Sequence, residues 1–188
     1  MKKLLIFIFF FFLSSCKPME SLETFVFDNT QFNSFLFTAN QIKVKQTYQP
    51  IFEEPYIDHS ILNSPSFRLK NWINENISSL GNENLLEINI LDASIKRNEL
   101  IDDKAKTLES KELYKYELFF LIEFALYDNS NYLIATTNVQ SFRSTTSSKF
   151  ISINEKDRII DELIFESLND ISNEADIYLN LYMSDYLL

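Results

Sequence analysis

The side chains that could do chemistry are few, and most of them lie in one stretch. The only histidine, His59, stands in a segment without periodicity between Pro50 and Ser64. Asp58 and Ser60 flank it, so the three neighbours carry the side-chain types of a serine-hydrolase triad. Adjacent residues point in different directions, however, whereas a nucleophile, its base and the orienting carboxylate must converge in space. We therefore expect a loop histidine that is solvated or caps a turn.

Two glutamates in the same stretch could be imagined as the acid and base of a hydrolase. Glycoside hydrolysis requires two carboxylates that face each other across a cleft, about 5 to 10 Å apart. Neighbouring carboxylates in a loop are ordinarily solvated, so we predict no catalytic residue. Loops of this length are uncommon in compact domains and are often functional when ordered. The loop is therefore the best candidate for a partner-contact surface, with Glu53, Glu54, Tyr56 and His59 as the contact residues.

The rest of the composition excludes several kinds of site. The chain has one glycine, which excludes a phosphate-binding glycine loop, a dinucleotide fingerprint and a Gly-x-Ser-x-Gly elbow. A lone histidine excludes the two-histidine zinc motif and most zinc sites. We accordingly expect no cofactor, no metal and no enzymatic activity.

The remaining reactive side chain, Cys16, follows a segment that resembles an export signal. Lys2 and Lys3 precede an apolar run from Leu4 to Leu13, and two serines follow before the cysteine. A charged start, a short apolar run and small residues at the cleavage site describe a secretory signal peptide. Crossing the hydrocarbon core takes roughly 20 apolar residues, so this run is too short for an ordinary membrane span.

The order Leu13-Ser14-Ser15-Cys16 resembles the lipobox of bacterial lipoproteins. This resemblance implies cleavage before Cys16 and attachment of acyl chains, palmitate among them, to that cysteine. Two or more chains hold a protein firmly to a membrane, because each buried methylene contributes about 0.8 kcal/mol. In the enterobacterial sorting rule an aspartate after the cysteine favours retention in the inner membrane. Lys17 stands there, which favours the periplasmic face of the outer membrane, with the inner membrane as the alternative.

Length and charge limit what the part of the chain after the predicted cleavage site can be. Removing residues 1–15 leaves 173 residues, enough for a single domain with its own core. The chain has a net charge of −10, which becomes −12 without the two signal lysines, and such a surface repels nucleic acid and anionic lipid headgroups. With one cysteine no internal disulfide can form, so the fold depends on packing, for which 18 Phe and 9 Tyr provide material.

The apolar patterning predicts the elements in chain order. Residues 16–40 form the lipidated N-terminus and a tether, whose phenylalanines we expect to dock on a single domain at 41–188 rather than to form a partner-binding strip. Alternation predicts strands at Gln41–Tyr48 and Leu86–Ile90, the second of which can run on to Ile95 and precedes a polar loop at 96–111. Between these strands, Ser64-Pro65 opens a helix that Gly81 ends, with Trp72 in the core.

The second half of the domain predicts a hairpin and a long helix. Tyr114–Leu126 alternates most clearly, and a turn of Asp and Asn residues leads to a strand from Tyr132 to Arg143. Pairing Tyr127 with Tyr132 would set Leu126, Phe124, Ile122 and Phe120 opposite Leu133, Ala135, Thr137 and Val139. Helical spacing then runs from a cap at Asn154 to about Tyr182. The order β-α-β-β-β-α predicts a two-layer α+β domain, with a four-stranded, mainly antiparallel sheet and two helices on one face.

This order is similar to that of small Gram-negative envelope lipoproteins, such as the lipopolysaccharide-assembly lipoprotein and the auxiliary lipoproteins of ABC transporters. The chain departs from the first family just after the cysteine, where Lys17-Pro18-Met19 replaces the usual Gly-Phe-His-type stretch. We therefore transfer no functional residues. The resulting hypothesis is a lipid-anchored, non-catalytic periplasmic protein that assists an envelope assembly or transport complex by binding a protein partner. The alternatives are a lipid carrier with an apolar groove and a carboxylate-dependent envelope hydrolase.

Overall fold

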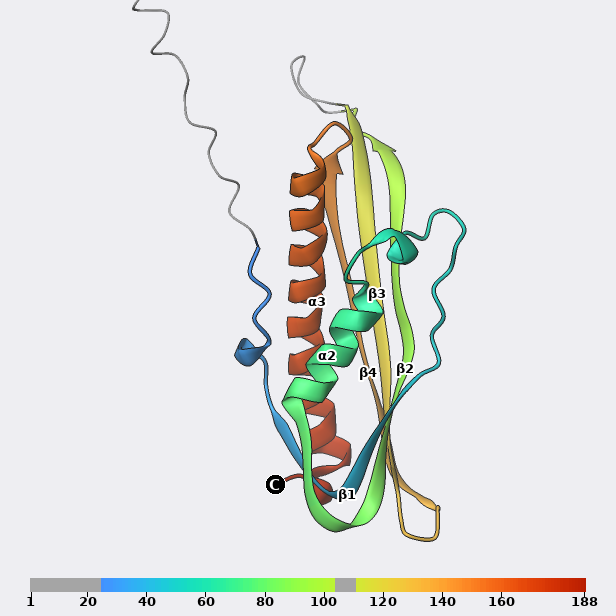
Figure 1. Cartoon of the computed structure of the whole chain (residues 1–188), viewed down its shortest axis with the longest axis vertical. Coiled ribbons are helices and arrows are strands. Elements are labelled where there is room, and N and C mark those ends of the chain that lie inside the picture. Colours follow the sequence, from blue (N-terminus) through green and yellow to red (C-terminus); the bar gives the residue numbers. More distant parts are fainter. Residues whose placement is uncertain (1–24, 104–110) are drawn as a thin grey trace, which may run out of the picture.

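The computed structural model describes residues 25–103 and 111–188, so the signal segment and Cys16 lie outside the described residues. Four strands and two helices make up most of this part (Figure 1): β1 (Phe35–Gln46), α2 (Pro65–Asn76), β2 (Ile77–Ile101), β3 (Glu112–Tyr127), β4 (Leu133–Ser148) and α3 (Ile153–Tyr182). Three short 3-10 turns accompany them: η2 (Asn29–Gln31), η3 (Asp58–Ser60) and η4 (Ser184–Tyr186).

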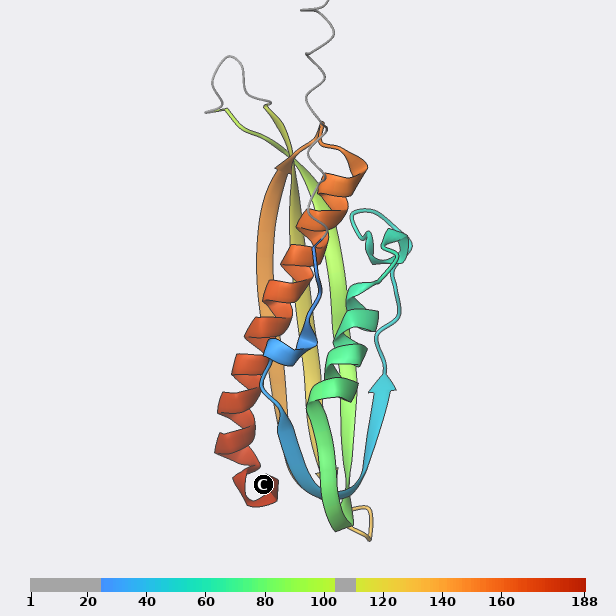
Figure 2. The ribbon, with the colours of Figure 1, turned by 60° about the vertical axis from the view of Figure 1, so that its left-hand side comes forward.

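The strands form one sheet in the order β1-β2-β3-β4. β1 runs parallel to β2, and the β2–β3 and β3–β4 pairs are antiparallel. Both helices pack on the same face of this sheet, side by side (Figure 2). The predicted α+β class, the element order and the mainly antiparallel sheet are thus confirmed.

The core lies between the sheet and the two helices. β3 provides its central row, and these side chains are at most 1% exposed: Tyr116, Leu118, Phe120, Ile122, Phe124 and Leu126. From the helix layer, α2 adds Trp72 at 0% exposure, and α3 adds Ile164 and Leu168 at the same value. The alternating apolar residues of β3 are therefore buried, as the pattern predicts. Side chains fill the space between the sheet and the helices.

The first helix ends earlier than predicted. Ser64 caps it through a bond from the Phe67 amide to its hydroxyl, but the helix stops at Asn76 and β2 begins at the next residue. The Asn76 side-chain amide donates to the Trp72 carbonyl oxygen at 3.1 Å, while Ile77 pairs with Phe35 of β1. Pairing with a distant strand thus ends the helix, and the prediction that Gly81 ends it was wrong.

The strands are longer than the local alternation indicated. β1 begins at Phe35, six residues before the predicted start, and β2 extends to Ile101. The residues of β2 from Lys96 to Ile101 pair with Glu112–Glu117 of β3, so this part of the predicted polar loop is strand. Cross-strand hydrogen bonds hold these polar residues in the sheet, which their sequence pattern alone does not indicate.

The β3–β4 hairpin has the predicted faces but a different register. Phe124 lies opposite Thr137 and Leu126 opposite Ala135, a shift of two residues from the predicted pairing. The Asp128 carboxylate accepts hydrogen bonds from the amides of Ser130 and Tyr132, and the register is irregular between Leu126 and Tyr127, just before this turn. A shift of two keeps the side-chain alternation, so the same residues still face the core. α3 ends at Tyr182 as predicted but is capped by Ser152 instead of Asn154.

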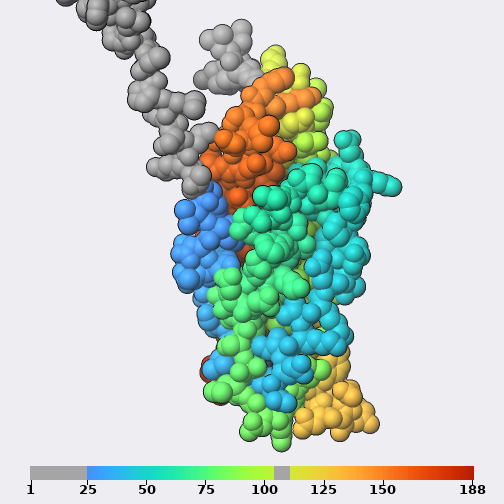
Figure 3. Space-filling model, in the orientation of Figure 1, coloured from blue at the N-terminus to red at the C-terminus, as the bar shows by residue number. Residues whose placement is uncertain are grey.

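The described part of the N-terminal segment docks on the helices. The ring of Phe165 on α3 is contacted by three phenylalanine rings, with centroids 5.6 Å away for Phe25, 5.4 Å for Phe27 and 5.1 Å for Phe32. The guanidinium of Arg68 on α2 lies 4.1 Å from the centre of the Phe27 ring. This segment, drawn in blue, covers the surface beside α3 in Figure 3. The phenylalanines therefore pack against the domain, as predicted, and do not form a free strip.

Candidate functional site

The loop between β1 and α2, which holds the predicted contact residues, is tied to the edge of β2. The Ile57 amide donates to the Ile95 carbonyl oxygen at 3.0 Å, and the Arg97 amide donates to the Pro55 carbonyl oxygen at 2.9 Å. An isolated bridge between Tyr56 and Lys96 lies between these two bonds. The loop therefore continues the pairing along β2 beyond the end of β1.

Three of the four predicted contact residues, Glu53, Glu54 and His59, are exposed on this loop, and Tyr56 is half-buried. The His59 Nδ1 atom lies 3.1 Å from the Ile51 carbonyl oxygen, and its ring lies 5.1 Å from that of Phe52. The Lys96 ammonium lies 4.9 Å from the centre of the Tyr56 ring. The loop thus presents two carboxylates, an imidazole and a neighbouring cation to solvent, which suits contact with a polar partner.

Asp58 and His59 do not form a catalytic unit. Asp58 is 2% exposed and turns inward, where its Oδ2 accepts a hydrogen bond from the Tyr48 hydroxyl at 3.0 Å. His59 turns outward, so the two side chains diverge, as expected for adjacent residues. Burial and the bond to Asp58 raise the pKa of the Tyr48 phenol above its ordinary value, which keeps it a hydrogen-bond donor. The pair fastens the loop to the end of β1.

Replacing Tyr48 with Phe is expected to lower the free energy of unfolding by about 1–2 kcal/mol, because the buried Asp58 carboxylate loses its donor. In the wild type the phenol pKa is higher in the folded state than in the unfolded state. Its contribution to stability is therefore present below pH ~10 and is lost as the pH rises further. Urea unfolding from pH 7 to 11 should show a larger loss in the wild type than in Tyr48→Phe, where burial still raises the pKa of the Tyr116 phenol. Tyr56→Phe is the matched control, and an equal effect of both substitutions would contradict the role of the bond.

One open depression of about 360 Å³ brings a loop glutamate near another carboxylate. Glu54 and Glu99 both line it, together with Arg97 and Tyr114. Both glutamates are exposed, and the Glu99 carboxylate pairs with the Lys149 ammonium at 3.1 Å. A glycosidase-type acid is a carboxyl in apolar surroundings, whereas this depression is open and charged. The arrangement is that of a solvated surface.

A charged cluster that was not predicted from the sequence lies where α3 passes β4. Arg143 of β4 pairs with Asp170 through two nitrogens and with Glu166 at 3.4 Å. The hydrogen bonds to Asp170 raise the pKa of the Arg143 guanidinium. Further towards the start of α3, Arg158 pairs with Glu155 at 2.7 Å and Glu162 at 3.0 Å. The spacing of acidic residues by four along α3 is the signal that could have revealed this cluster.

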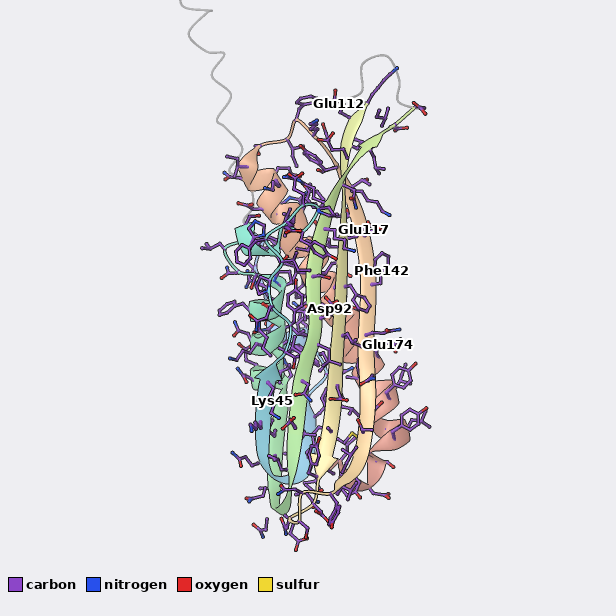
Figure 4. All side chains as sticks on the ribbon, turned by 90° about the vertical axis from the view of Figure 1, so that its right-hand side faces the viewer. Lys45, Asp92, Glu112, Glu117, Phe142 and Glu174 are labelled. Carbon is purple, nitrogen blue, oxygen red and sulfur yellow. The ribbon has the colours of Figure 1, made fainter. Side chains whose placement is uncertain are left out.

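The opposite face of the sheet carries polar cross-strand pairs at several points along its length (Figure 4). The Lys45 ammonium pairs with Glu87 at 2.5 Å, and the Asn89 amide donates to the Glu123 carboxylate at 2.8 Å. Towards the other end, the Asn98 amide donates to the Glu117 carboxylate at 2.9 Å. These pairs cross from strand to strand, so the parts of this face that carry them are adapted to water.

Two structural findings bear on membrane and metal binding. Of the helices in residues 25–103 and 111–188, none is long and apolar enough to cross a membrane. Within the same ranges, no group of three or more His, Cys, Asp or Glu side chains is arranged to hold a metal ion.

Comparison with known proteins gives a likeness of structure only. No family model matches the chain, and no curated protein matches it by sequence. A minor lipoprotein from Acinetobacter baumannii is 12% identical, with a TM-score of 0.42, over 78% of this chain and 96% of the other. The rare lipoprotein B from Shewanella oneidensis is 13% identical, with a TM-score of 0.35, over 76% and 98%.

A third solved structure, described as a homologue of a neuraminyllactose-binding hemagglutinin from Helicobacter pylori, is 9% identical. Its TM-score is 0.37, over 88% of this chain and 90% of the other. Likenesses this distant carry no argument about function, so the proposal below depends on the residues of this chain.

Proposed function

We propose that this protein is a lipid-anchored, non-catalytic accessory protein of the bacterial envelope, which binds a protein partner in an assembly or transport complex. The observation that carries the proposal is the sequence Leu13-Ser14-Ser15-Cys16, placed between a short apolar run and a folded domain. An acidic domain does not bind an anionic bilayer by charge, so acyl chains on Cys16 supply the membrane attachment. The absence of an aspartate after Cys16 favours the periplasmic face of the outer membrane.

The docked tether limits how far the domain can stand from its membrane. Nine residues lead from Cys16 to Phe25, where the chain is already packed against Phe165. A fully extended chain of that length spans about 30 Å. The anchored domain therefore works beside the bilayer, within reach of the periplasmic parts of membrane proteins.

Metabolic labelling with a palmitate analogue, followed by membrane fractionation, tests the anchor. We expect the wild type to carry the label and to fractionate with the outer membrane, and Cys16→Ala to lose both the label and the membrane association. Ser15→Ala is the matched control, because it keeps a small residue before the cysteine and should remain labelled. An unlabelled wild type would contradict the proposal and make a freely secreted domain the starting point.

The packing of the core bears on the lipid-carrier alternative. A carrier needs an apolar groove between sheet and helices, and that space is occupied by side chains such as Trp72, Ile164 and Phe124, all at 0% exposure. Opening such a groove would expose side chains that now form the core of the domain. The filled core therefore favours a protein-binding role over lipid transport.

A further inference from the structure

β4 is a long edge strand with little protection against further pairing. It has 16 residues, pairs with β3 on one side, and has no strand on its other side within the described residues. Proteins usually protect such edges with charged residues, proline or bulges. β4 contains no proline, and its only charge, Arg143, is engaged by Asp170 and Glu166. The β1 edge differs, since it carries both Lys43 and Lys45.

The helix beside this edge is acidic. Glu162, Glu166, Asp170 and Glu174 follow one another at intervals of four along α3, and we call them the acidic row. Asp170 and Glu166 reach Arg143 of β4, and Glu174 emerges beside β4, below Phe142, in Figure 4. With Glu155, the cluster has five carboxylates against the two guanidinium groups of Arg143 and Arg158, so the side of α3 next to the edge is negative.

Space for additional side chains exists along the same edge. An open depression of about 430 Å³ lies between the last third of β4 and the first half of α3. Its walls are Arg143–Thr146 on the strand, and Arg158, Glu162 and Glu166 among the helix residues. On the other face of β4, Ile134 is 40% exposed and Phe142 61% exposed, and the Phe142 position lies directly opposite Phe119 of β3. The edge is thus acidic on the helix side, and on the open side it carries two exposed apolar side chains with polar residues between them.

We propose that the β4 edge binds an extended segment of a protein partner by strand addition. The segment carries Lys or Arg on the side that faces the acidic row and apolar residues on the side of Ile134 and Phe142. Main-chain hydrogen bonds would give the affinity, and the alternating side chains the specificity. This inference rests on the proposed function and names the class of partner that the accessory protein binds.

A second copy of the chain fits the edge less well. Antiparallel pairing of two β4 strands would place both α3 helices on the same face of the joined sheet, with one acidic row near the other. Like charges in that position repel, and each chain already carries a net charge of −10. A cationic segment would instead be attracted to the acidic row.

The test uses full-length, detergent-solubilised protein and three ten-residue probe peptides. The first alternates Lys and Val and can form a strand with one cationic and one apolar side. The second alternates Glu and Val and reverses the charge. The third alternates Lys and Pro, which keeps the charge but cannot pair as a strand, because proline lacks the amide donor. Fluorescence anisotropy measures affinity, and amide hydrogen exchange locates the binding site.

We expect the Lys-Val peptide to bind at least tenfold more tightly than either control and to slow exchange in residues 133–148. The double variant Glu166→Gln/Glu174→Gln should weaken this binding about fivefold or more. Glu75→Gln/Glu83→Gln, which removes the same charge from α2 and the first part of β2, should leave it unchanged.

Equal binding of the three peptides, or no added protection in β4, would overturn the inference. Protection of β4 that appears without peptide and grows with protein concentration would also overturn it, because the occupant would then be a second copy. The probes act on the folded domain, so this result can be interpreted whether or not Cys16 proves to be acylated.

Discussion

Trp72→Ala is expected to lower the free energy of unfolding by about 3–5 kcal/mol, the range for removing a large aromatic side chain from a core. Trp72 is 0% exposed and lies on α2, which packs chiefly on β2. Its indole Nε1 is buried without a hydrogen-bond partner among the described residues, so the side chain contributes through packing alone. Urea unfolding followed by circular dichroism would measure the loss.

Two further variants distinguish packing from other causes. Phe67→Ala removes an aromatic ring from the same helix at a position that is 49% exposed, so it should cost less than half as much. Trp72→Phe keeps most of the apolar volume and removes an N–H group that has no acceptor among the described residues, and it should therefore be the milder change at this site. If Trp72→Ala were no worse than Phe67→Ala, Trp72 would not be the packing centre of α2.

The elements that could be predicted from the sequence are those whose own residues carry a continuous apolar pattern. β3 alternates over its whole length, and α3 repeats its apolar residues at helical spacing as far as Tyr182, so both were found nearly to their ends. The faces of the β3–β4 hairpin were also predictable. Its register was not predictable, because the Asp128 carboxylate accepts hydrogen bonds from two backbone amides of the turn and the strand pairing is irregular at Tyr127.

The boundary between α2 and β2 could not be predicted from local pattern. Ile73, Ile77 and Leu80 continue the helical spacing, yet the chain becomes strand at Ile77 because Phe35 lies there to pair with it. This partner is 42 residues earlier in the sequence, and parallel pairing leaves no turn motif to reveal it. The early start of β1 and the register shift near Gly81 belong to the same pairing.

The candidate site was predicted in part. Glu53, Glu54 and His59 are exposed on the loop at 50–64, and their role as partner contacts stays a prediction. Nothing in the sequence pattern joins Tyr48 to Asp58, ten residues away. The sheet edge was harder still, since no single segment shows which strand will lie outermost. Only after β4 is placed at the edge does the acidic spacing on α3 acquire a possible use.

α3 connects the docked N-terminal segment with the edge proposed for the partner. Phe165 receives the tether on one side of the helix, while Glu166 and Asp170 reach Arg143 of β4 on another. Ile164 and Leu168 face the core between them. Because one helix borders both surfaces, the proposed acylation of Cys16 would bring a partner bound at the β4 edge close to the bilayer.

Gly81→Ala is expected to destabilise the protein by about 2–3 kcal/mol, although Gly81 is exposed. A Cβ atom there would lie 1.9 Å from the Thr38 carbonyl oxygen and 2.4 Å from its carbon. Phe37 of β1 pairs with Ser79 of β2, and Ala39 pairs with Glu83. Between these two pairs β1 has one residue and β2 has three, and Gly81 is the middle one of the three, close to the β1 backbone. Close approach, and not a left-handed backbone, is therefore what requires glycine here.

The neighbouring Leu80 provides the matched control for this variant. It is 69% exposed, so Leu80→Ala should change stability by no more than about 0.5 kcal/mol, as surface substitutions usually do. Because the clash is with backbone, Gly81→Ala can be accommodated only by separating β1 from β2. Amide exchange should therefore accelerate in residues 35–46 before it does in β3. A stability change as small as that of Leu80→Ala, with β1 still protected, would show that the close approach of β1 to β2 at position 81 does not depend on glycine.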